Sequence, residues 1–489
     1  MAASVWKTRV FLFTAGLCLA LVSACSTIVD RDALDSSEFA NPGCARLYGD
    51  LHQVTRAVRD SQYHSVPGLP MVRTSRFLSS FDVDSSAQRT EVLREQNRLA
   101  QRTLLIEFAN LAGEPRQQWL AARGLTEDRL ADQLADCGEL LVAEMAANPQ
   151  LTAPLSLSVS DAYRTSLRVL GLYPLVAPVF RLSVVGEQRD YGELAGKLRT
   201  HLAREPGAFR LYYGFSAPLS GPSLMVEQAP GQATLSSEDS ARLFARHAPR
   251  WLIETRTVDD LPGRPVIDSD GRPAVDTQVP AVYAALTRGR FGDSVTTQLN
   301  YVLWFPARPA QQPLDLLAGR LDSLIWRVHL DGAGRPIAYD SIHSCGCWYK
   351  IWPAEGYRLT PPKGPYIEPV WAGPALGSPS PLLGVSAIDH QLTVLAEATP
   401  ITAVPREPLA SLSYASLKTL KHGPGTRSLF DRRGFVPGTQ RLERWLFWPM
   451  GIANPGAMRV LGNQPIAFVG RRHFDDPRLL DDLGLSAEN

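Results

Sequence analysis

The chain has 489 residues and is close to neutral, with 50 lysines and arginines against 49 aspartates and glutamates. A balance this close provides no positive field to attract a polyanion, so the composition argues against a nucleic-acid partner. Hydrophobic residues make up 45% of the sequence, which is enough for the core of one or two domains.

A basic start precedes an apolar run at the N-terminus. Lys7 and Arg9 are followed by VFLFTAGLCLALV, residues 10–22, and then by small residues before Cys25. This order is typical of a secretory signal peptide. The run is shorter than the roughly 20 residues that span a bilayer comfortably, so a transmembrane anchor is the weaker alternative.

The segment Val22-Ser23-Ala24-Cys25 resembles the lipobox of bacterial lipoproteins. The resemblance covers this segment alone. It implies that residues 1–24 are a signal peptide and that Cys25 carries lipid, including an acyl chain such as palmitate. Ser26 then implies an outer-membrane address, with the folded part facing the periplasm. Since two or more acyl chains hold a protein stably at a bilayer, we expect the membrane to be a partner through this lipid.

The residue pattern of the mature sequence changes along the chain. A helix capped by Ser85 or Ser86 is expected to run to about residue 111, and another follows a cap at Thr126. Glycine and proline punctuate strand-like runs from about residue 209. The fold class is therefore α+β, a helical N-terminal half followed by an antiparallel β-rich C-terminal half. We predict a polar stalk (25–45), a mainly helical region (46–205), an antiparallel β-rich region (206–353), a proline- and glycine-rich loop (354–385) and an α/β region packed on the sheet (386–489).

Two of the four cysteines that remain after Cys25 lie in the predicted helical part or just before it. The steps of four and three in the helix capped by Thr126 place Cys137 on its buried stripe. An oxidising compartment permits disulfides, but a single sequence does not fix the pairing. Cys137 is therefore either a core thiol or the disulfide partner of Cys44.

A third apolar stretch, SLRVLGLYPLVAPVFRLSVV, covers residues 166–185. Its length suggests a membrane segment, but Arg168, Arg181, Pro174 and Pro178 argue against a span, since charge and helix breaks are costly in hydrocarbon. We expect two short buried elements around a proline kink. A segment that lies on the membrane surface is the alternative.

The β-rich part contains two predicted hairpins. One joins residues 281–287 to 294–305, and the other joins 324–330 to 336–341. Three segments end in an aromatic–proline pattern, before Pro306, Pro353 and Pro449, where proline is expected to stop a strand. An aromatic ligand groove made from these three ends is the alternative interpretation.

The stretch DSIHSCGCWYKIWP, residues 340–353, holds the best functional candidate. If it is extended, His343, Cys345 and Cys347 share one face, whereas a turn at Gly346 would bring the two sulfurs together. Thiolate and imidazole suit zinc, and copper(I) takes thiolate readily. The predicted metal ligands are thus His343, Cys345 and Cys347, with His390, His473, His329 or water completing the site.

Three other interpretations compete with a metal site. Cys345 and Cys347 could form a redox pair, because a Cys-Gly-Cys disulfide is strained and exchanges readily. Either thiol could be a catalytic nucleophile with His343 or another histidine as base. Both could instead be structural, as a disulfide or as small core residues. Two classes stay open: a lipid-anchored envelope protein with metal or thiol chemistry, and a non-catalytic envelope protein that binds a small ligand or another protein.

Overall fold

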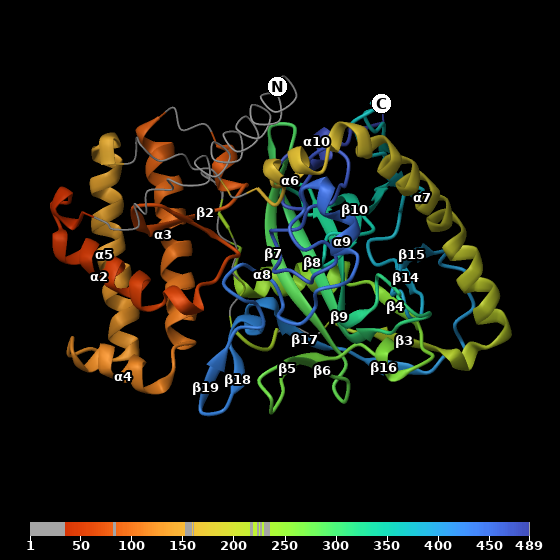
Figure 1. Ribbon diagram of the computed structural model, residues 1–489, viewed down its shortest axis with the longest axis horizontal. Helices are drawn as coiled ribbons and strands as arrows, with labels where there is room; N and C mark the ends of the chain where they lie inside the picture. Colours follow the sequence, from red (N-terminus) through yellow and green to blue (C-terminus); the bar gives the residue numbers. More distant parts are fainter. Residues whose placement is uncertain are drawn as a thin grey trace, which may run out of the picture.

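The computed structural model describes residues 35–81, 85–151, 159, 161–215, 219–222, 224, 227–228 and 235–488. The predicted signal peptide and Cys25 lie outside these residues. Helices dominate the N-terminal part, and a largely antiparallel sheet with a smaller mixed sheet forms the centre of the C-terminal part (Figure 1). The predicted α+β class is confirmed.

The N-terminal helical part forms where the sequence patterns place it. Ser85 and Thr126 cap their helices as expected: their side chains accept hydrogen bonds from the backbone N–H groups of Gln88 and Arg129. The first helix begins within the segment predicted as stalk. The elements are α2 (Pro42–Val54), β1 (His64–Val66), β2 (Leu69–Thr74), α3 (Ser86–Ala109), α4 (Gly113–Ala121) and α5 (Glu127–Ala147).

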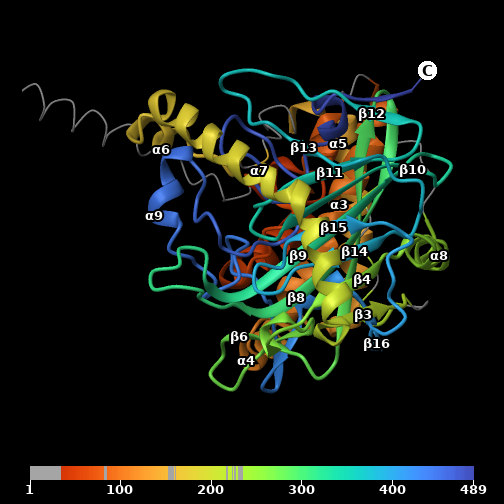
Figure 2. The same cartoon turned by 90° about the vertical axis from the view of Figure 1, so that its right-hand side faces the viewer.

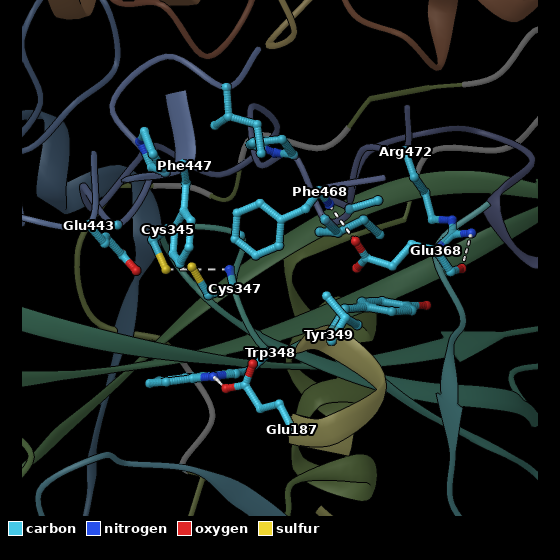
Figure 3. A pocket seen from close by; sticks show the side chains of 18 of the residues that line it. Glu187, Cys345, Cys347, Trp348, Tyr349, Glu368, Glu443, Phe447, Phe468 and Arg472 are labelled. Atoms are coloured by element: carbon cyan, nitrogen blue, oxygen red, sulfur yellow. Dashed lines mark hydrogen bonds between the residues drawn. The ribbon is translucent and has the colours of Figure 1, made fainter. Parts of the chain in front are cut away.

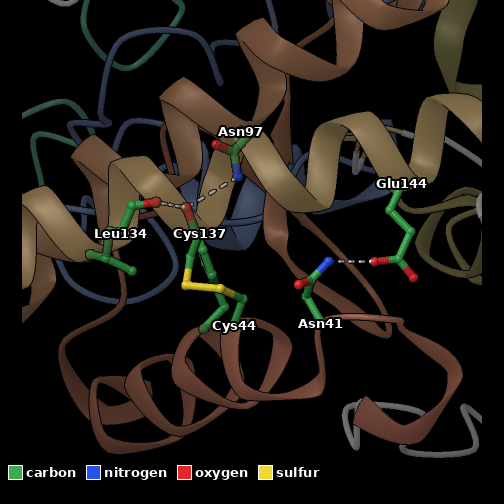
Figure 4. The surroundings of a disulfide bond; sticks show 7 residues. Asn41, Cys44, Asn97, Leu134, Cys137 and Glu144 are labelled. Carbon is green, nitrogen blue, oxygen red and sulfur yellow. Dashed lines mark hydrogen bonds between the residues drawn. A yellow bond between two sulfur atoms is a disulfide. The ribbon is translucent and has the colours of Figure 1, made fainter.

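A disulfide between Cys44 and Cys137 joins α2 to α5 (Figure 4). The side chain of Tyr48, one turn further along α2, donates a hydrogen bond to the carbonyl of Leu134 at 2.8 Å. Cys137 is therefore the partner of Cys44, as the buried stripe allowed. The cross-link closes a sequence separation of 93 residues.

We expect loss of this disulfide to lower the free energy of unfolding by roughly 2–4 kcal/mol, because the unfolded chain regains the freedom of a long loop. Denaturant unfolding of the native protein and of a Cys44→Ser/Cys137→Ser variant measures the difference. Reductant should shift the native midpoint toward that of the variant while changing the variant far less. Equal midpoints for the two proteins would contradict a stabilising role.

The larger sheet has seven strands in the order β13-β11-β10-β9-β8-β7-β17. Both predicted hairpins are confirmed, as antiparallel pairs of β7 with β8 and of β9 with β10. Gly292 has φ +56° in the two-residue connection between β7 and β8, a conformation that favours glycine. The strands are β7 (Ala281–Phe291), β8 (Ser294–Arg308), β9 (Gly319–Leu330), β10 (Pro336–His343), β11 (Lys350–Pro353), β13 (Trp371–Ala372) and β17 (Ala410–Ser413).

A five-stranded sheet packs against the larger one. Its buried Trp251 and Ile253 belong to the same core cluster as Tyr301 and Trp326 of the larger sheet. Its strands, in spatial order, are β15 (Leu392–Leu395), β14 (Leu382–Val385), β4 (Arg250–Glu254), β3 (Phe209–Tyr213) and β16 (Arg406–Pro408). The remaining elements are α8 (Ser237–His247), β5 (Arg264–Ile267), β6 (Pro273–Asp276), β12 (Tyr357–Leu359), β18 (Leu420–His422), β19 (Gly425–Arg427), α9 (Arg444–Phe447), α10 (Leu479–Asp482) and β20 (Leu485–Ala487), with short 3-10 turns between them.

The apolar stretch 166–185 forms two helices, α6 (Thr165–Leu170) and the long α7 (Tyr173–Arg204). The break lies at Leu172, which has φ +50°, whereas Pro174 lies in the first turn of α7, where a missing N–H is tolerated. The second half of α7 covers the smaller sheet through Leu198 and Leu202 (Figure 2). The expectation that residues 166–185 are buried is wrong, because Ala177 is the only buried residue among them and six large apolar side chains are exposed. None of the described helices is both long and apolar enough to cross a membrane.

The three aromatic–proline ends behave differently. Pro353 ends β11 as predicted, but β8 continues through Pro306 to Arg308. Strand β7 pairs with β8 only as far as Val302, so one edge of β8 is free of a ladder at Pro306 and a missing N–H is tolerated. The segment before Pro449 is helical, in α9 and the 3-10 turn Trp448–Met450, and the prediction of a strand there is wrong.

Candidate functional site

The chain turns immediately after β10 and brings the two thiols together. The N–H of His343 donates to the carbonyl of Cys347 at 3.1 Å, and the N–H of Gly346 donates to the carbonyl of His343 at 2.7 Å. Gly346 has φ +96°, and a Cβ there would collide with the carbonyl oxygen of Pro465. The structure therefore has the turn rather than the extended strand.

Neither Cys345 nor Cys347 is in a disulfide, although their sulfurs lie beside each other (Figure 3). The backbone N–H of Cys347 donates to Sγ of Cys345 at 3.4 Å. A hydrogen bond between the thiols and burial together raise the pKa of Cys347 well above its usual value. Cys347 is therefore mostly a neutral thiol at neutral pH. A neutral thiol is a weaker nucleophile and a weaker metal ligand than a thiolate.

A cavity of about 150 Å³ lies against the two thiols. Four segments that are distant in sequence form its walls: one side of α7, the turn 345–349, residues 368–370 and the C-terminal segment between 441 and 472. Aromatic side chains supply much of the wall, among them Trp348, Tyr349, Phe447 and Phe468 (Figure 3). An enclosed, largely apolar space with a few polar groups is the usual form of a small-molecule site.

Three glutamates face this cavity. Glu187 on α7 accepts a hydrogen bond from the indole of Trp348, and Oε2 of Glu368 accepts the backbone N–H groups of Phe468 at 2.6 Å and Val469 at 3.0 Å. Burial raises the pKa of Glu187, and it raises the pKa of Glu368 to about 7. The pKa of Glu443 is likewise raised to about 7 by burial. Glu368 and Glu443 are thus partly neutral at physiological pH.

Cationic groups lie around the same space. Arg441 and Arg472 line the cavity, and Arg472 donates to the carbonyl of Glu368 at 3.4 Å. Lys350, at the start of β11, does not line the cavity but is buried over the ring of Tyr191, which does, and burial lowers the pKa of Lys350 to about 7. The cavity lining itself therefore carries acidic and basic groups together.

The histidine of the predicted cluster is turned away from the cavity. Nδ1 of His343 lies 3.2 Å from Oδ1 of Asp322, and Nε2 lies 3.1 Å from the carbonyl of His390. His390 in turn lies 2.9 Å from Asp322 and 3.5 Å from Asp260. Both nitrogens of each ring face oxygen atoms. Burial lowers the pKa of His343, whereas hydrogen bonds to Asp260 and Asp322 outweigh burial and raise the pKa of His390. Arg441 completes this buried network through a 3.2 Å contact with Asp322.

The other predicted ligands are also engaged elsewhere. His473 contacts Asp161 at 3.1 Å and Asp476 at 3.4 Å, and His329 lies 3.2 Å from the buried Asp340. Within the described part of the chain, no three histidine, cysteine, aspartate or glutamate side chains form a group that could hold a metal ion. The structure thus unites Cys345 with Cys347, and His343 with His390, but places these pairs on different sides of the turn.

Sequence reasoning missed the three cavity glutamates. Glu187 lies in a helix, Glu368 in the predicted loop and Glu443 just before α9, more than 70 residues apart from one another. An isolated glutamate usually indicates a solvated surface, and no motif in a single sequence marks it as buried. No protein-family model, curated protein or solved structure matches this chain.

We expect the raised pKa values of Glu368 and Glu443 to make folding less stable as the pH rises. Unfolded glutamates ionise near pH 4.3 whereas the folded ones hold their protons to about pH 7, so the folded state binds more protons in this window and loses stability across it. The loss amounts to roughly 3 kcal/mol for each carboxyl.

A Glu368→Gln/Glu443→Gln variant, unfolded by denaturant at several pH values, should lose most of this slope. The exposed Glu193 and Glu238 provide a matched control pair for the same substitution. Parallel stability curves for the native protein and the Glu368→Gln/Glu443→Gln variant would show that these carboxyls ionise normally.

Proposed function

We propose that this protein binds a small, largely apolar molecule with a hydrogen-bonding or amine group in the cavity beside Cys345 and Cys347. The proposal includes the address that the lipobox implies: attachment through lipid on Cys25 to the outer membrane, facing the periplasm. The observation that carries it is the convergence of aromatic side chains, the buried Glu368 and Glu443 and the half-buried Glu187 on one pocket.

The protonation of the glutamates suits such a ligand. A neutral carboxyl both donates and accepts a hydrogen bond, and it leaves the cavity apolar enough for a hydrocarbon or aromatic group. Once ionised, Glu368 and Glu443 attract an ammonium group instead. Binding energy then comes mainly from apolar burial, at about 25 cal/mol for each Å² removed from water, while the carboxyls orient the ligand.

Binding accounts for the site better than nucleophilic catalysis does. An attacking thiol needs a base to remove its proton or a surrounding that lowers its pKa. The pKa of Cys347 is raised, and the ring nitrogens of His343 are directed to Asp322 and to the carbonyl of His390. The non-catalytic class is therefore the one that the geometry supports.

An environment-sensitive probe tests this function. N-phenylnaphthylamine, which is apolar and carries one N–H donor, should gain fluorescence on binding the native protein. Val184 lines the cavity, so a Val184→Trp variant should fill it and reduce the affinity about tenfold or more. The same substitution at the exposed Val258, which does not line the cavity, is the control. Equal binding by both variants would place the probe elsewhere and overturn the proposal.

The adjacent thiols favour a second candidate, a dithiol that exchanges with disulfides. In this reaction one thiolate attacks an external disulfide and releases one thiol, and the second thiolate then displaces the other, so that Cys345–Cys347 is oxidised and two thiols are released. Zinc or copper binding at these two sulfurs stays a prediction of the same candidate.

Thiol counting and metal analysis of the purified protein distinguish these alternatives. We expect two titratable thiols in the unfolded, unreduced protein and no stoichiometric zinc or copper. Incubation with oxidised glutathione should then produce a protein lighter by two hydrogens if the pair exchanges, whereas a Cys345→Ser variant should stop at a mixed disulfide. One metal ion for each chain, lost in the Cys345→Ser variant, would instead establish a thiolate metal site.

A further inference from the structure

An exposed apolar stripe runs along the first half of α7. Leu175, Val179 and Leu182 lie within about 60° of one another around the helix axis, and they are 71%, 63% and 69% exposed. Farther along the helix the same stripe carries Glu193 and Lys197, which form a 2.9 Å ion pair in solvent. The stripe therefore changes from apolar to charged within one helix. A helix on the surface of a water-soluble protein directs its apolar stripe toward the core. The first half of α7 instead directs its apolar stripe toward solvent.

A second exposed apolar segment adjoins this stripe. Trp445 and Leu446 of α9 are 69% and 52% exposed. The ring of Phe447 packs 5.6 Å from that of Phe180 on α7, and Nε of Arg168 on α6 donates to the carbonyl of Met450 at 2.8 Å. Figure 2 shows α6, the start of α7 and α9 together at one end of the molecule. We call the outward side chains of residues 169–182 and 442–448 the apolar face.

A basic cleft of about 340 Å³ lies beside the apolar face. Arg164, the residue that precedes α6, lines it together with Arg432 and Arg433. Its two acidic lining residues are neutralised by other partners, Asp60 by Lys418 and Asp161 by Arg471.

The sequence around the apolar face is also one-sided in charge. Residues 162–186 and 444–474 contain no aspartate or glutamate, and the arginines in them are Arg164, Arg168, Arg181, Arg444, Arg459, Arg471 and Arg472. The protein as a whole is close to neutral, but the charged side chains of these two segments are all arginines.

We propose that the apolar face docks onto the surface of a lipid bilayer that contains anionic lipid. Leucine and valine side chains would enter the acyl boundary, and Trp445 and Trp448 would lie at the headgroup level, where tryptophan is favoured. The arginines of the basic cleft would then face the anionic headgroups, which attract basic side chains near the membrane surface. A continuous negative surface matches this excess of arginine, because Asp60 and Asp161 beside it are paired with Lys418 and Arg471.

The docked orientation also indicates which class of ligand enters the cavity. Val184 and Phe447 line the cavity and are sequence neighbours of the apolar face. On the proposed function, which this step rests on, the ligand class is therefore an amphiphile that partitions into the bilayer. Docking itself requires no ligand.

Vesicle binding by the full chain tests the docking. All proteins carry Cys25→Ser, so that the predicted lipid is absent and every comparison shares the same N-terminus. Leu175→Ser/Leu182→Ser removes apolar area without a change of charge, and Glu193→Ser/Lys197→Ser is its match on the same stripe. Co-sedimentation with phosphatidylcholine vesicles is measured with and without phosphatidylglycerol, and the thermal midpoint checks that each variant is folded.

We expect the leucine pair to weaken binding to anionic vesicles about tenfold or more and the control pair to leave it unchanged. Arg164→Gln/Arg432→Gln should weaken binding only where phosphatidylglycerol is present. Hydrogen exchange should slow on added vesicles in peptides from 169–182 and 442–448, and not in those from 189–204.

Equal vesicle binding by the two variant pairs, or unchanged exchange in the apolar face, overturns docking. A second result would also overturn docking: the protein is a dimer in solution, and Leu175→Ser/Leu182→Ser dissociates the dimer without changing vesicle binding. The apolar face would then contact a second copy of the chain. Loss of docking with retained N-phenylnaphthylamine binding would refute this inference and leave the proposed function intact.

Discussion

The buried carboxylate of Asp322 holds together the region on which the site depends. It is fully inaccessible and accepts hydrogen bonds from His343, His390, Arg441 and the N–H of Ser323. His343 is the last residue of β10, so its imidazole anchors the turn that carries the two thiols. Arg441 lines the cavity. One carboxylate thus holds both the residue that precedes the thiol turn and an arginine of the cavity wall, and loss of a single partner from such a buried network typically costs 3–5 kcal/mol.

Buried carboxyls in this protein ionise in opposite directions according to their partners. Burial alone would raise the pKa of Asp322, but the positive charges of His343 and Arg441 hold it well below its usual value. Glu443 is buried to a similar degree, yet its neighbouring arginines offset burial only in part, so its pKa rises to about 7. Asp322 is therefore a fixed structural charge, whereas the cavity glutamates can change their protonation with pH or with a ligand.

The sequence predicted those features that depend on local patterns. Ser85 and Thr126 cap helices because their hydroxyls satisfy N–H groups three residues away, and glycine marks the β7–β8 turn. The sequence left open whether Cys137 pairs with Cys44 or stays a core thiol. The disulfide forms because α2 lies beside the buried stripe of α5 that carries Cys137. Such contacts are set by tertiary packing, which a single sequence does not specify.

The direction of His343 and the composition of the cavity were not predictable in the same way. An extended strand and a turn at Gly346 were both compatible with the spacing, and the close approach of Pro465 from the C-terminal segment excludes any residue but glycine. The stretch 166–185 was misjudged for a related reason: apolar composition was equated with burial, although apolar atoms also form much of a protein surface.

The ligand cavity and the apolar face lie on opposite sides of helix α7. Val184, Glu187 and Tyr191 line the cavity, and their positions centre roughly 150° around the axis from Leu175. Leu182 and Val184 are two residues apart but point in nearly opposite directions, since each residue advances the helix by about 100°. A substitution on the apolar stripe therefore leaves the cavity wall untouched. Ligand binding and bilayer docking can accordingly fail or persist independently, although one helix supports both.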